Sequence, residues 1–351
     1  MVAEALNIAI RTKKFNMIKI YDKSVIYLMC PPRFATGGPE LMHQLAHKLS
    51  MAGMNAKMFY YPQVENPVHE DYRVYGTEYT ESIDDNSKNV LIIPEVMVPD
   101  VNSMTNLRQI RKCVWWLSVD GFFKKVHSTK IYKGLKLLLP SSKFPFFEDR
   151  YFNKHIVQSS YAFHLVQSRY AYNFLTNRGI HSTYLSDYLN STFIESSTKV
   201  DLTKKSDIVL YNPKKGYQFT KALISQSPEL NWIPIVNLKP IQVSELLGRA
   251  KVYVDFGHHP GKDRFPREAA ILSCCIITGR RGSAFNDEDV PIARKYKIDD
   301  RAKNIPDVIS LIKDVLTNYQ THVLNFDSYR KKIINEEAEF IGDVKRVFVI
   351  D

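Results

Sequence analysis

Short apolar runs alternate with longer amphipathic stretches along most of the chain. This alternation is typical of βαβ units, in which buried parallel strands are joined by helices. In the first half we expect strands at residues 24–30, 56–61, 90–94 and 114–119, and another strand that includes Val157. The helices expected between these strands cover residues 40–51, 107–112 and 168–177.

Residues 195–207 are rich in Ser, Thr and Lys and lose this periodicity, which is typical of a linker. A second series then predicts strands at 207–211, 232–236, 251–256 and 274–278, with helices at 217–226, 243–249 and 265–273. We therefore expect an α/β protein with two Rossmann-like, doubly wound domains facing each other across a cleft. The expected domains cover residues 1–195 and 196–325, and a helical segment, 326–351, is expected to pack back on the first domain.

Charge narrows the choice of partners. The chain has a formal net charge of +11 and a pI of about 9.2. A basic protein suits nucleic acid, an anionic membrane or a phosphorylated small molecule, unless the lysines and arginines only solvate its surface. The sequence shows neither a signal peptide nor a membrane span, and its four cysteines lack metal-site spacing, so we expect a cytoplasmic protein with reduced thiols.

Three basic loops follow strands of the second series, where ligands bind in open α/β sheets. The first runs from Asn212 through Lys214 and Lys215 to Gly216, and opens a helix. Backbone N–H groups, the helix dipole and a lysine there suit a phosphate. A solvated lysine turn is the equally weighted alternative.

The second loop, residues 256–268, leads into a helix with Pro266 in its first turn. Its cations Lys262, Arg264 and Arg267 predict an anion site at the helix terminus. Glu268 is suited to accept hydrogen bonds from a ribose, although it also makes an ordinary first-turn carboxylate. We interpret His258 and His259 as part of a polar loop and not as a metal site, because the sequence lacks further metal ligands at suitable spacing.

The third loop, residues 279–283, places Arg281 between glycines and suggests phosphate contacts, or else an exposed basic turn. The order of strands, the Lys-Gly pair, the Gly-rich loop and Pro-x-Glu-Ala-Ala resembles the donor domain of GT-B glycosyltransferases. The likeness is nearest to the retaining glycosyltransferase family four and to relatives in bacterial surface-polysaccharide clusters. It implies that Lys215 holds a diphosphate and that Glu268 binds the nucleotide ribose.

The sequence departs from that family at two positions. The first of the family's two glutamates falls at Pro260, so its contact with the donor sugar would pass to His259, Lys262 or Asp263. The family's arginine before the lysine has only Asn212 or Lys214 as counterparts.

In the first domain, the loop at Gly37 and Gly38 resembles the Gly-rich loop that shapes the sugar pocket of such enzymes. Asp120 follows an apolar strand and is expected to face the cleft, as a general base or an acceptor-orienting group. The alternative is an aspartate that caps a turn before Gly121. Residues 287–289, Asp-Glu-Asp, are interpreted as a surface acidic turn and not as a metal motif.

The resemblance implies metal-independent, retaining transfer of a sugar from a nucleotide-sugar donor to a glycan or lipid-linked acceptor in surface-polysaccharide assembly. Lys215, Lys262 and Arg264 would neutralise the departing phosphate. The alternatives are a sugar-nucleotide epimerase and a non-catalytic nucleotide- or nucleic-acid-binding protein; nucleic acid is not expected as a partner, because a recognised motif is lacking. Lysines and apolar residues interleave in residues 121–147, so this segment either contacts anionic membranes peripherally or forms part of the core.

Overall fold

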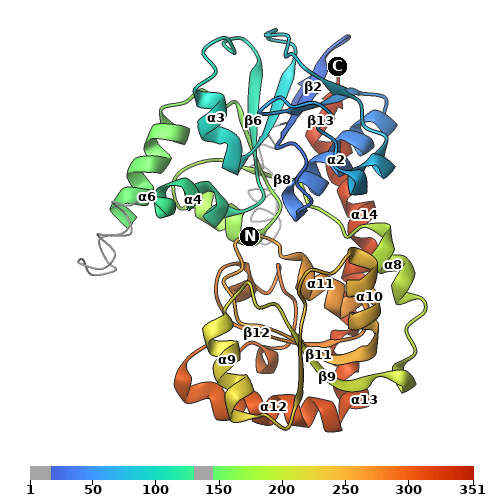
Figure 1. Cartoon of the computed structure of the whole chain (residues 1–351). Coiled ribbons are helices and arrows are strands. Elements are labelled where there is room, and N and C mark those ends of the chain that lie inside the picture. The colour runs from blue at the N-terminus through green and yellow to red at the C-terminus, as the bar shows by residue number, and fades with distance from the viewer. Residues whose placement is uncertain (1–16, 130–144) are drawn as a thin grey trace, which may run out of the picture. The chain divides into compact units, whose positions relative to one another are not determined.

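A computed structural model describes residues 17–129 and 145–351 of the chain. The chain divides into two compact α/β units (Figure 1). Unit 1 contains the chain up to Gln167 together with Ala171–Leu185 and Ile341–Asp351. Unit 2 contains Ser168–Tyr170 and Ser186–Phe340.

Unit 1 is built on a parallel sheet of seven strands in the order β4-β3-β2-β5-β6-β7-β8. The strands are β2 (Val25–Cys30), β3 (Asn55–Tyr60), β4 (Tyr79–Thr80), β5 (Val90–Pro94), β6 (Arg111–Trp116), β7 (Phe163–Val166) and β8 (Thr183–Tyr184). The three central strands β2, β5 and β6 are largely buried because helices cover both faces of the sheet. The strand order reverses between β2 and β5, which makes that position the switch point of unit 1.

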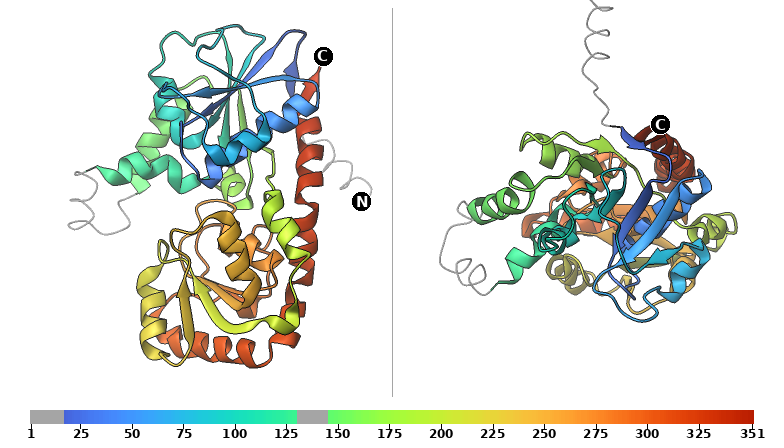
Figure 2. Two further views of the ribbon diagram at one scale, coloured as in Figure 1. Left: turned by 45° about the vertical axis from the view of Figure 1, so that its right-hand side comes forward. Right: turned by 90° about the horizontal axis from the view of Figure 1, so that it is seen from above.

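Helix α2 (Gly37–Met51) packs on β2 and β3, and α3 and α4 lie on the other face of the sheet (Figures 1 and 2). The other helices with residues in unit 1 are α3 (Val98–Asn102), α4 (Val119–Ser128), α6 (Pro145–Phe152), α7 (Arg169–Thr176) and the end of α14 (Asp327–Val347). A separate pair of parallel strands joins β1 (Ile18–Ile20) to β13 (Phe348–Ile350), as Figure 2 shows beside the C-terminus.

Unit 2 has a parallel four-stranded sheet in the order β10-β9-β11-β12. These strands are β9 (Ser206–Tyr211), β10 (Asn231–Pro234), β11 (Ala250–Asp255) and β12 (Cys275–Thr278). The chain moves outward from β9 to β10 and then crosses back to β11, so the switch point lies between β9 and β11. The loops that follow these two strands therefore border the crevice where such sheets bind ligands.

Helices also cover both faces of the sheet in unit 2 (Figure 1). The helices are α8 (Ser191–Ser197), α9 (Tyr217–Gln226), α10 (Pro240–Arg249), α11 (Arg264–Ile271), α12 (Ile305–Thr317), α13 (Tyr319–His322) and the first part of α14. Helix α12 contacts α9 and β11, whereas α10 contacts α11 and β9. The core between these layers is apolar and includes the fully buried side chains of Tyr253, Phe256 and Phe326.

The fold class predicted from the sequence is confirmed, with four differences in detail. Residues 107–112, expected as a helix, end in β6, and Val157 ends a π-helical turn (Asn153–Val157) in place of a strand. The boundary near 195 lies earlier, between Leu185 and Ser186, because α8 packs on α10 inside unit 2. The expected segment 326–351 is divided at Phe340 between the two units.

Two sequence expectations concern the membrane and the thiols. Among the described residues, none of the helices has the length and apolar character to cross a bilayer. All four cysteines, Cys30, Cys113, Cys274 and Cys275, are free and buried. Burial raises the pKa of each of these thiols, so they pack as small apolar side chains.

Candidate functional site

The loops after β9 and β11 touch at the switch point of unit 2. Gly216 ends the first loop with a left-handed backbone, φ +56°, and a Cβ on it would lie 2.5 Å from the carbonyl carbon of Phe256. Only glycine tolerates both the positive φ and this approach. The contact brings Lys215 against Gly257, so the predicted basic loop and the predicted Gly-rich loop form one site.

Asn212 shapes the first loop from inside. Its side-chain Oδ1 accepts a hydrogen bond from the Lys214 N–H at 2.9 Å, and its carbonyl accepts one from the Lys215 N–H at 3.3 Å. Asn212 is buried, whereas Lys214 is exposed. The structure therefore gives Asn212 a turn-forming role, and its ligand contact stays a prediction.

Lys215 extends toward the second loop and forms an ion pair with Asp263. The lysine side chain is 27% exposed and the aspartate 15% exposed, so the pair lies at the surface of the crevice. Asp263 is also the residue before α11, yet its side chain makes no capping hydrogen bond to the first turn. The Asp263 carboxylate therefore does not satisfy the N–H groups at the start of α11, where the helix dipole favours an anion.

Glu268 and Arg264 lie one turn apart on α11. The carboxylate Oε1 of Glu268 is 3.2 Å from Nε of Arg264, and both side chains are largely covered. Ala269 and Ala270, which follow, are fully buried against the sheet. This pairing orients the Glu268 carboxylate beside the same helix terminus, as expected for a residue that accepts hydrogen bonds from ribose hydroxyls.

His259, expected in a polar loop, is fully buried between two carboxylates. Its Nδ1 lies 3.0 Å from Asp263 Oδ2, and its Nε2 lies 3.4 Å from Oδ1 of Asp255, the last residue of β11. Burial alone would lower the pKa of His259, but the two carboxylates outweigh burial and raise it to about 9. The imidazole is therefore positively charged at neutral pH.

Asp255, His259 and Asp263 are also a group that could hold a metal ion. One ligand atom from each residue lies within 4.8 Å of the others. The two carboxylates already face two cations, His259 and Lys215, so the charges of the cluster balance without an ion. A metal would have to displace the proton of His259, since only neutral imidazole is a ligand.

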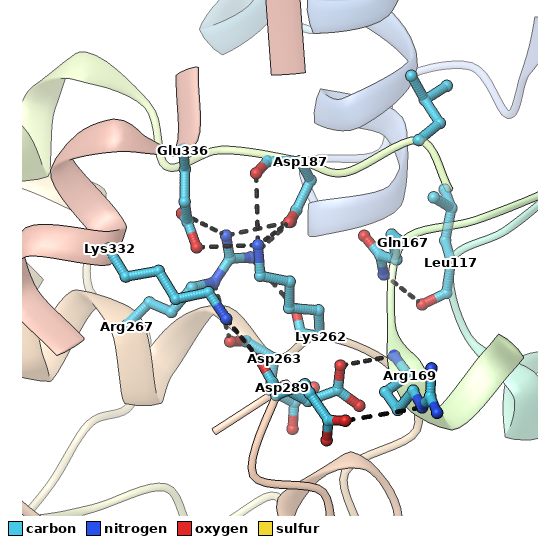
Figure 3. Close-up of polar contacts among 12 residues, drawn as sticks. Leu117, Gln167, Arg169, Asp187, Lys262, Asp263, Arg267, Asp289, Lys332 and Glu336 are labelled. Atoms are coloured by element: carbon cyan, nitrogen blue, oxygen red, sulfur yellow. Dashed lines mark hydrogen bonds and ion pairs between the residues drawn. The ribbon is translucent and has the colours of Figure 1, made fainter. Parts of the chain in front are cut away.

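Lys262 has a structural role, which corrects the expectation that it faces a ligand phosphate. Its Nζ lies 2.8 Å from Asp187 Oδ1 and 2.8 Å from Glu336 Oε1. The guanidinium of Arg267 contacts the same two carboxylates, at 2.5 Å and 2.8 Å (Figure 3). All four side chains are buried or nearly so, and the buried charges compensate one another.

The third loop supports the second one through its backbone. The N–H of His259 donates to Arg281 O at 3.4 Å, and the N–H of Ser283 donates to His259 O at 2.8 Å. The Arg281 side chain is half exposed, donates to Phe256 O at 3.1 Å and pairs with Asp300. Arg281 therefore lies beside the crevice, but part of its charge is compensated within the protein.

The acidic turn at residues 287–289 is only partly at the surface, which corrects its interpretation. Asp289 is buried, and its carboxylate accepts hydrogen bonds from the N–H groups of Arg169 and Tyr170 at 2.6 and 2.9 Å. Asp287 is exposed and pairs with Lys297 at 2.9 Å. The Asp289 carboxylate therefore stabilises the start of α7.

In unit 1, Gly37 and Gly38 are the first two residues of α2, although a loop was expected there. The residue before them, Thr36, makes no side-chain cap. His43 connects α2 to β3. Its Nδ1 lies 2.7 Å from Pro39 O within the helix, and its Nε2 lies 2.8 Å from Oη of Tyr60 on β3. The glycines thus open a rigid helix at the carboxyl end of β2.

Asp120 lies within the first turn of α4, two residues after its N-cap. The capping residue is Ser118, whose hydroxyl accepts the Gly121 N–H at 3.0 Å. A carboxylate in the first turn is favoured by the helix dipole, and this position differs from the strand end that was expected. The roles of general base and acceptor contact for Asp120 stay predictions.

The segment 121–147 is partly core. Phe122 and Phe123 are buried, and Phe122 packs on Trp116 with ring centroids 5.2 Å apart. These two rings are therefore not available to a membrane. Lys124 and Phe146 are exposed, and the lysines at 130, 133, 136 and 143 lie outside the described residues.

The sequence has no matching family model, and none of the curated proteins matches it. Solved structures do match. Sucrose-phosphate synthase from Thermosynechococcus elongatus is 10% identical, with a TM-score of 0.64 over 92% of this chain and 98% of that one. TarM is 10% identical, with a TM-score of 0.65 over 92% and 99%. Anabaena HepE in complex with UDP-glucose is 6% identical, with a TM-score of 0.58 over 92% and 98%.

These neighbours are GT-B glycosyltransferases, and at this level of identity the likeness shows that the chain has the GT-B fold. It extends over nearly the whole length of both chains. The more specific resemblance to glycosyltransferase family four stays a prediction.

Proposed function

We propose that the chain is a glycosyltransferase that takes a sugar from a nucleotide-sugar donor. The observation that carries the proposal is the switch point of the unit 2 sheet, where Lys215 pairs with Asp263 at the N-terminus of α11 and Arg264 pairs with Glu268 on the same helix. Structural neighbours with the same fold support it, and one of them is a UDP-glucose complex. We therefore place the donor diphosphate between Lys215 and α11, with its ribose on Glu268.

The chemistry follows from this placement. As the bond between the anomeric carbon and the phosphate oxygen breaks, negative charge grows on the diphosphate. Lys215, the α11 N-terminus and Arg264 supply fixed positive charge at that point. An acceptor hydroxyl forms the new bond to the anomeric carbon, and its proton passes to the departing diphosphate. Because these groups perform the stabilisation, the reaction we propose is metal-independent.

Asp263 is the residue that we assign to the donor sugar, in place of the glutamate missing at Pro260. Of the three candidates from the sequence, His259 is enclosed completely and Lys262 is 9% exposed and paired with two carboxylates. Asp263 is more exposed and lies beside Lys215. Its carboxylate is suited to accept hydrogen bonds from sugar hydroxyls.

The finer assignment also rests on the resemblance. We propose a glycan or lipid-linked acceptor in surface-polysaccharide assembly, with retention of anomeric configuration, in the cytoplasm and with peripheral contact to the inner face of the membrane. The net charge of +11 supports an anionic partner of this kind. Formation of a new sugar isomer, with free nucleotide and without transfer, would instead indicate an epimerase.

The test compares two neighbouring lysines. UDP, GDP, ADP and CMP are added to the protein, and the nucleotide that binds is expected to stabilise it by roughly 2.7 kcal/mol at 100 times its dissociation constant. Lys215→Ala should remove most of the stabilisation by the nucleoside diphosphate and leave binding of the nucleoside unchanged. Lys214→Ala, the exposed neighbour, is the control and should bind like the wild type. If none of the nucleotides stabilises the wild type, the proposed function is wrong.

A further inference from the structure

A chain of charged groups leads from the core of unit 2 to its crevice. It begins at Tyr253 on β11, whose hydroxyl donates to Asp255 Oδ2 at 3.0 Å. It continues through Asp255, His259 and Asp263 to Lys215. Side-chain exposure rises along it from 1% at Asp255 and 0% at His259 to 15% at Asp263 and 27% at Lys215. The contacts thus run from a buried end at Asp255 and His259 to a partly exposed end at Asp263 and Lys215.

We propose that Asp255 and His259 are positioning residues that hold Asp263, and through it Lys215, in the geometry that receives a sugar diphosphate. The inference rests on the proposed function, because it assigns these two buried groups to the same site. They reach the ligand only through Asp263 and Lys215. Neither residue touches the ligand itself.

The charge state of His259 decides whether its ring can hold both carboxylates. A doubly protonated imidazole carries a proton on each ring nitrogen, and each nitrogen of His259 lies within ion-pair distance of a carboxylate oxygen, 3.0 Å at Nδ1 and 3.4 Å at Nε2. A neutral ring would leave one nitrogen facing a carboxylate without a proton between them. His259 therefore fixes Asp263 only while it is charged, and the carboxylates of Asp255 and Asp263, which outweigh the effect of burial, raise its pKa to about 9.

The groups around His259 come from four elements. Strand β11 contributes Asp255 and Tyr253, the start of α11 contributes Asp263, and the β9 loop contributes Lys215. The loop after β12 faces the histidine with backbone only: a Cβ on Gly282 would lie 2.0 Å from His259 O. The backbone of this loop also hydrogen-bonds to that of His259, through Ser283 N–H to His259 O at 2.8 Å and His259 N–H to Arg281 O at 3.4 Å.

The arrangement also explains why Asp263 does not cap α11. A carboxylate at this position normally accepts hydrogen bonds from the first turn of the helix. Here its Oδ2 is engaged by His259 and Lys215 instead, and the side chain makes no cap. In the proposed arrangement, Asp263 is thus directed toward His259 and Lys215 and away from the first turn of α11.

The first measurement needs no ligand. Ring signals of the histidines are followed by NMR from pH 5 to pH 10, with His259→Gln and His258→Gln used for assignment. His258 is the exposed neighbour and serves as the matched control. We expect His259 to titrate near pH 9 and its pKa to fall in Asp255→Asn and in Asp263→Asn. Titration of His259 at or below its ordinary value of 6.5, or stoichiometric Zn²⁺ binding that abolishes the titration, would overturn the proposal.

The second measurement compares the binding of UDP and uridine by calorimetry. His259→Gln should weaken UDP binding at least tenfold and change uridine binding less than twofold, whereas His258→Gln should change neither. Because His259 acts through Asp263, adding His259→Gln to Asp263→Asn should produce no further loss. The positioning role is wrong if the losses in UDP affinity multiply in the double variant. It is also wrong if His259→Gln binds UDP like the wild type.

The outcomes separate the two proposals. A wild type that binds no nucleoside diphosphate contradicts the proposed function, whatever the histidine does. A wild type that binds UDP while His259→Gln binds it equally well contradicts only the positioning role. If His259→Gln fails to fold, Asp263→Asn carries the test, because its side chain reaches the surface. Asp263→Asn should weaken UDP binding and lower the pKa of His259. If either effect is absent, the positioning role is wrong.

Discussion

Gly216 and Phe256 meet backbone to backbone, although they follow different strands of the unit 2 sheet. The contact joins the loop that carries Lys215 to the loop that carries His259 and Asp263. A side chain at position 216 would push these two loops apart and would also force a positive φ on an L-residue.

We therefore expect Gly216→Ala to destabilise the protein by about 2–4 kcal/mol, the sum of backbone strain and overpacking. Denaturant unfolding measures the change. Gly248→Ala is the control, because Gly248 lies in α10 with open space at its Cβ position. That substitution should stabilise the helix by about 0.5–1 kcal/mol. Equal effects at the two positions would contradict the close approach.

Glu268→Gln is expected to keep the fold and weaken nucleotide binding by about 1–3 kcal/mol, because charged hydrogen bonds to the ribose are lost. A 2′-deoxynucleotide should discriminate less between wild type and variant than the ribonucleotide does. The exposed Glu245 on α10 provides a matched substitution, Glu245→Gln, that should leave binding unchanged. Unchanged affinity in Glu268→Gln would remove this residue from the site.

Chelation with EDTA should leave sugar transfer largely intact, because Lys215, Arg264 and the α11 N-terminus supply the positive charge. Activity is measured with and without the chelator at the same ionic strength. Complete loss that Mg²⁺ or Mn²⁺ restores would show that a cation takes part. The first place to search for it would be the group formed by Asp255, His259 and Asp263.

Glu95 gives unit 1 a measurable dependence of stability on pH. Its Oε2 accepts the Leu117 N–H at 2.7 Å, and burial raises the pKa of this carboxyl from 4.5 to about 8. The folded protein thus retains a proton that the unfolded chain releases, so stability falls as the pH rises from 4.5 to 8. Glu95→Gln should remove this fall and stabilise the protein at pH 8 by about 2 kcal/mol or more. Parallel pH profiles of wild type and variant would contradict the burial of a protonated carboxyl.

Arg267→Met should destabilise unit 2 by about 3–5 kcal/mol, because it leaves two buried carboxylates, Asp187 and Glu336, with only Lys262 as counter-charge. Thermal unfolding measures the loss. Arg301→Met, which breaks an exposed pair with Asp299, should cost less than about 1 kcal/mol. A small effect at Arg267 would show that the cluster adds little to stability.

The strands and helices of unit 2 could be predicted closely because its buried parallel strands are continuous apolar runs. Helix α9 and the last residue of β12 lie where the sequence placed them. The prediction failed at β6, whose strand begins with the charged residues Arg111 and Lys112. Periodicity does not distinguish such a start from a short helix.

The site was predictable where one loop carries the signal, and less so where two distant segments meet. Lys215 and Glu268 stand in local motifs, and the structure places both at the crevice. Asp187 and Glu336 carry no local signal, so the sequence could not show that they engage Lys262. Asp255 was missed, although the sequence contains a signal for it. A carboxylate at the end of a buried apolar strand needs a cation or hydrogen-bond donor as a partner.

The pairing of β1 with β13 has a consequence for synthesis on the ribosome. Ile18 lies opposite Phe348, and all of unit 2 is translated between these two strands. Unit 2 has its own core and can therefore collapse while β1 is still unpaired, before β13 has been synthesised. Among the strand pairs of the described residues, this pair has the largest sequence separation, and the entropy of closing so long a loop makes it a late step.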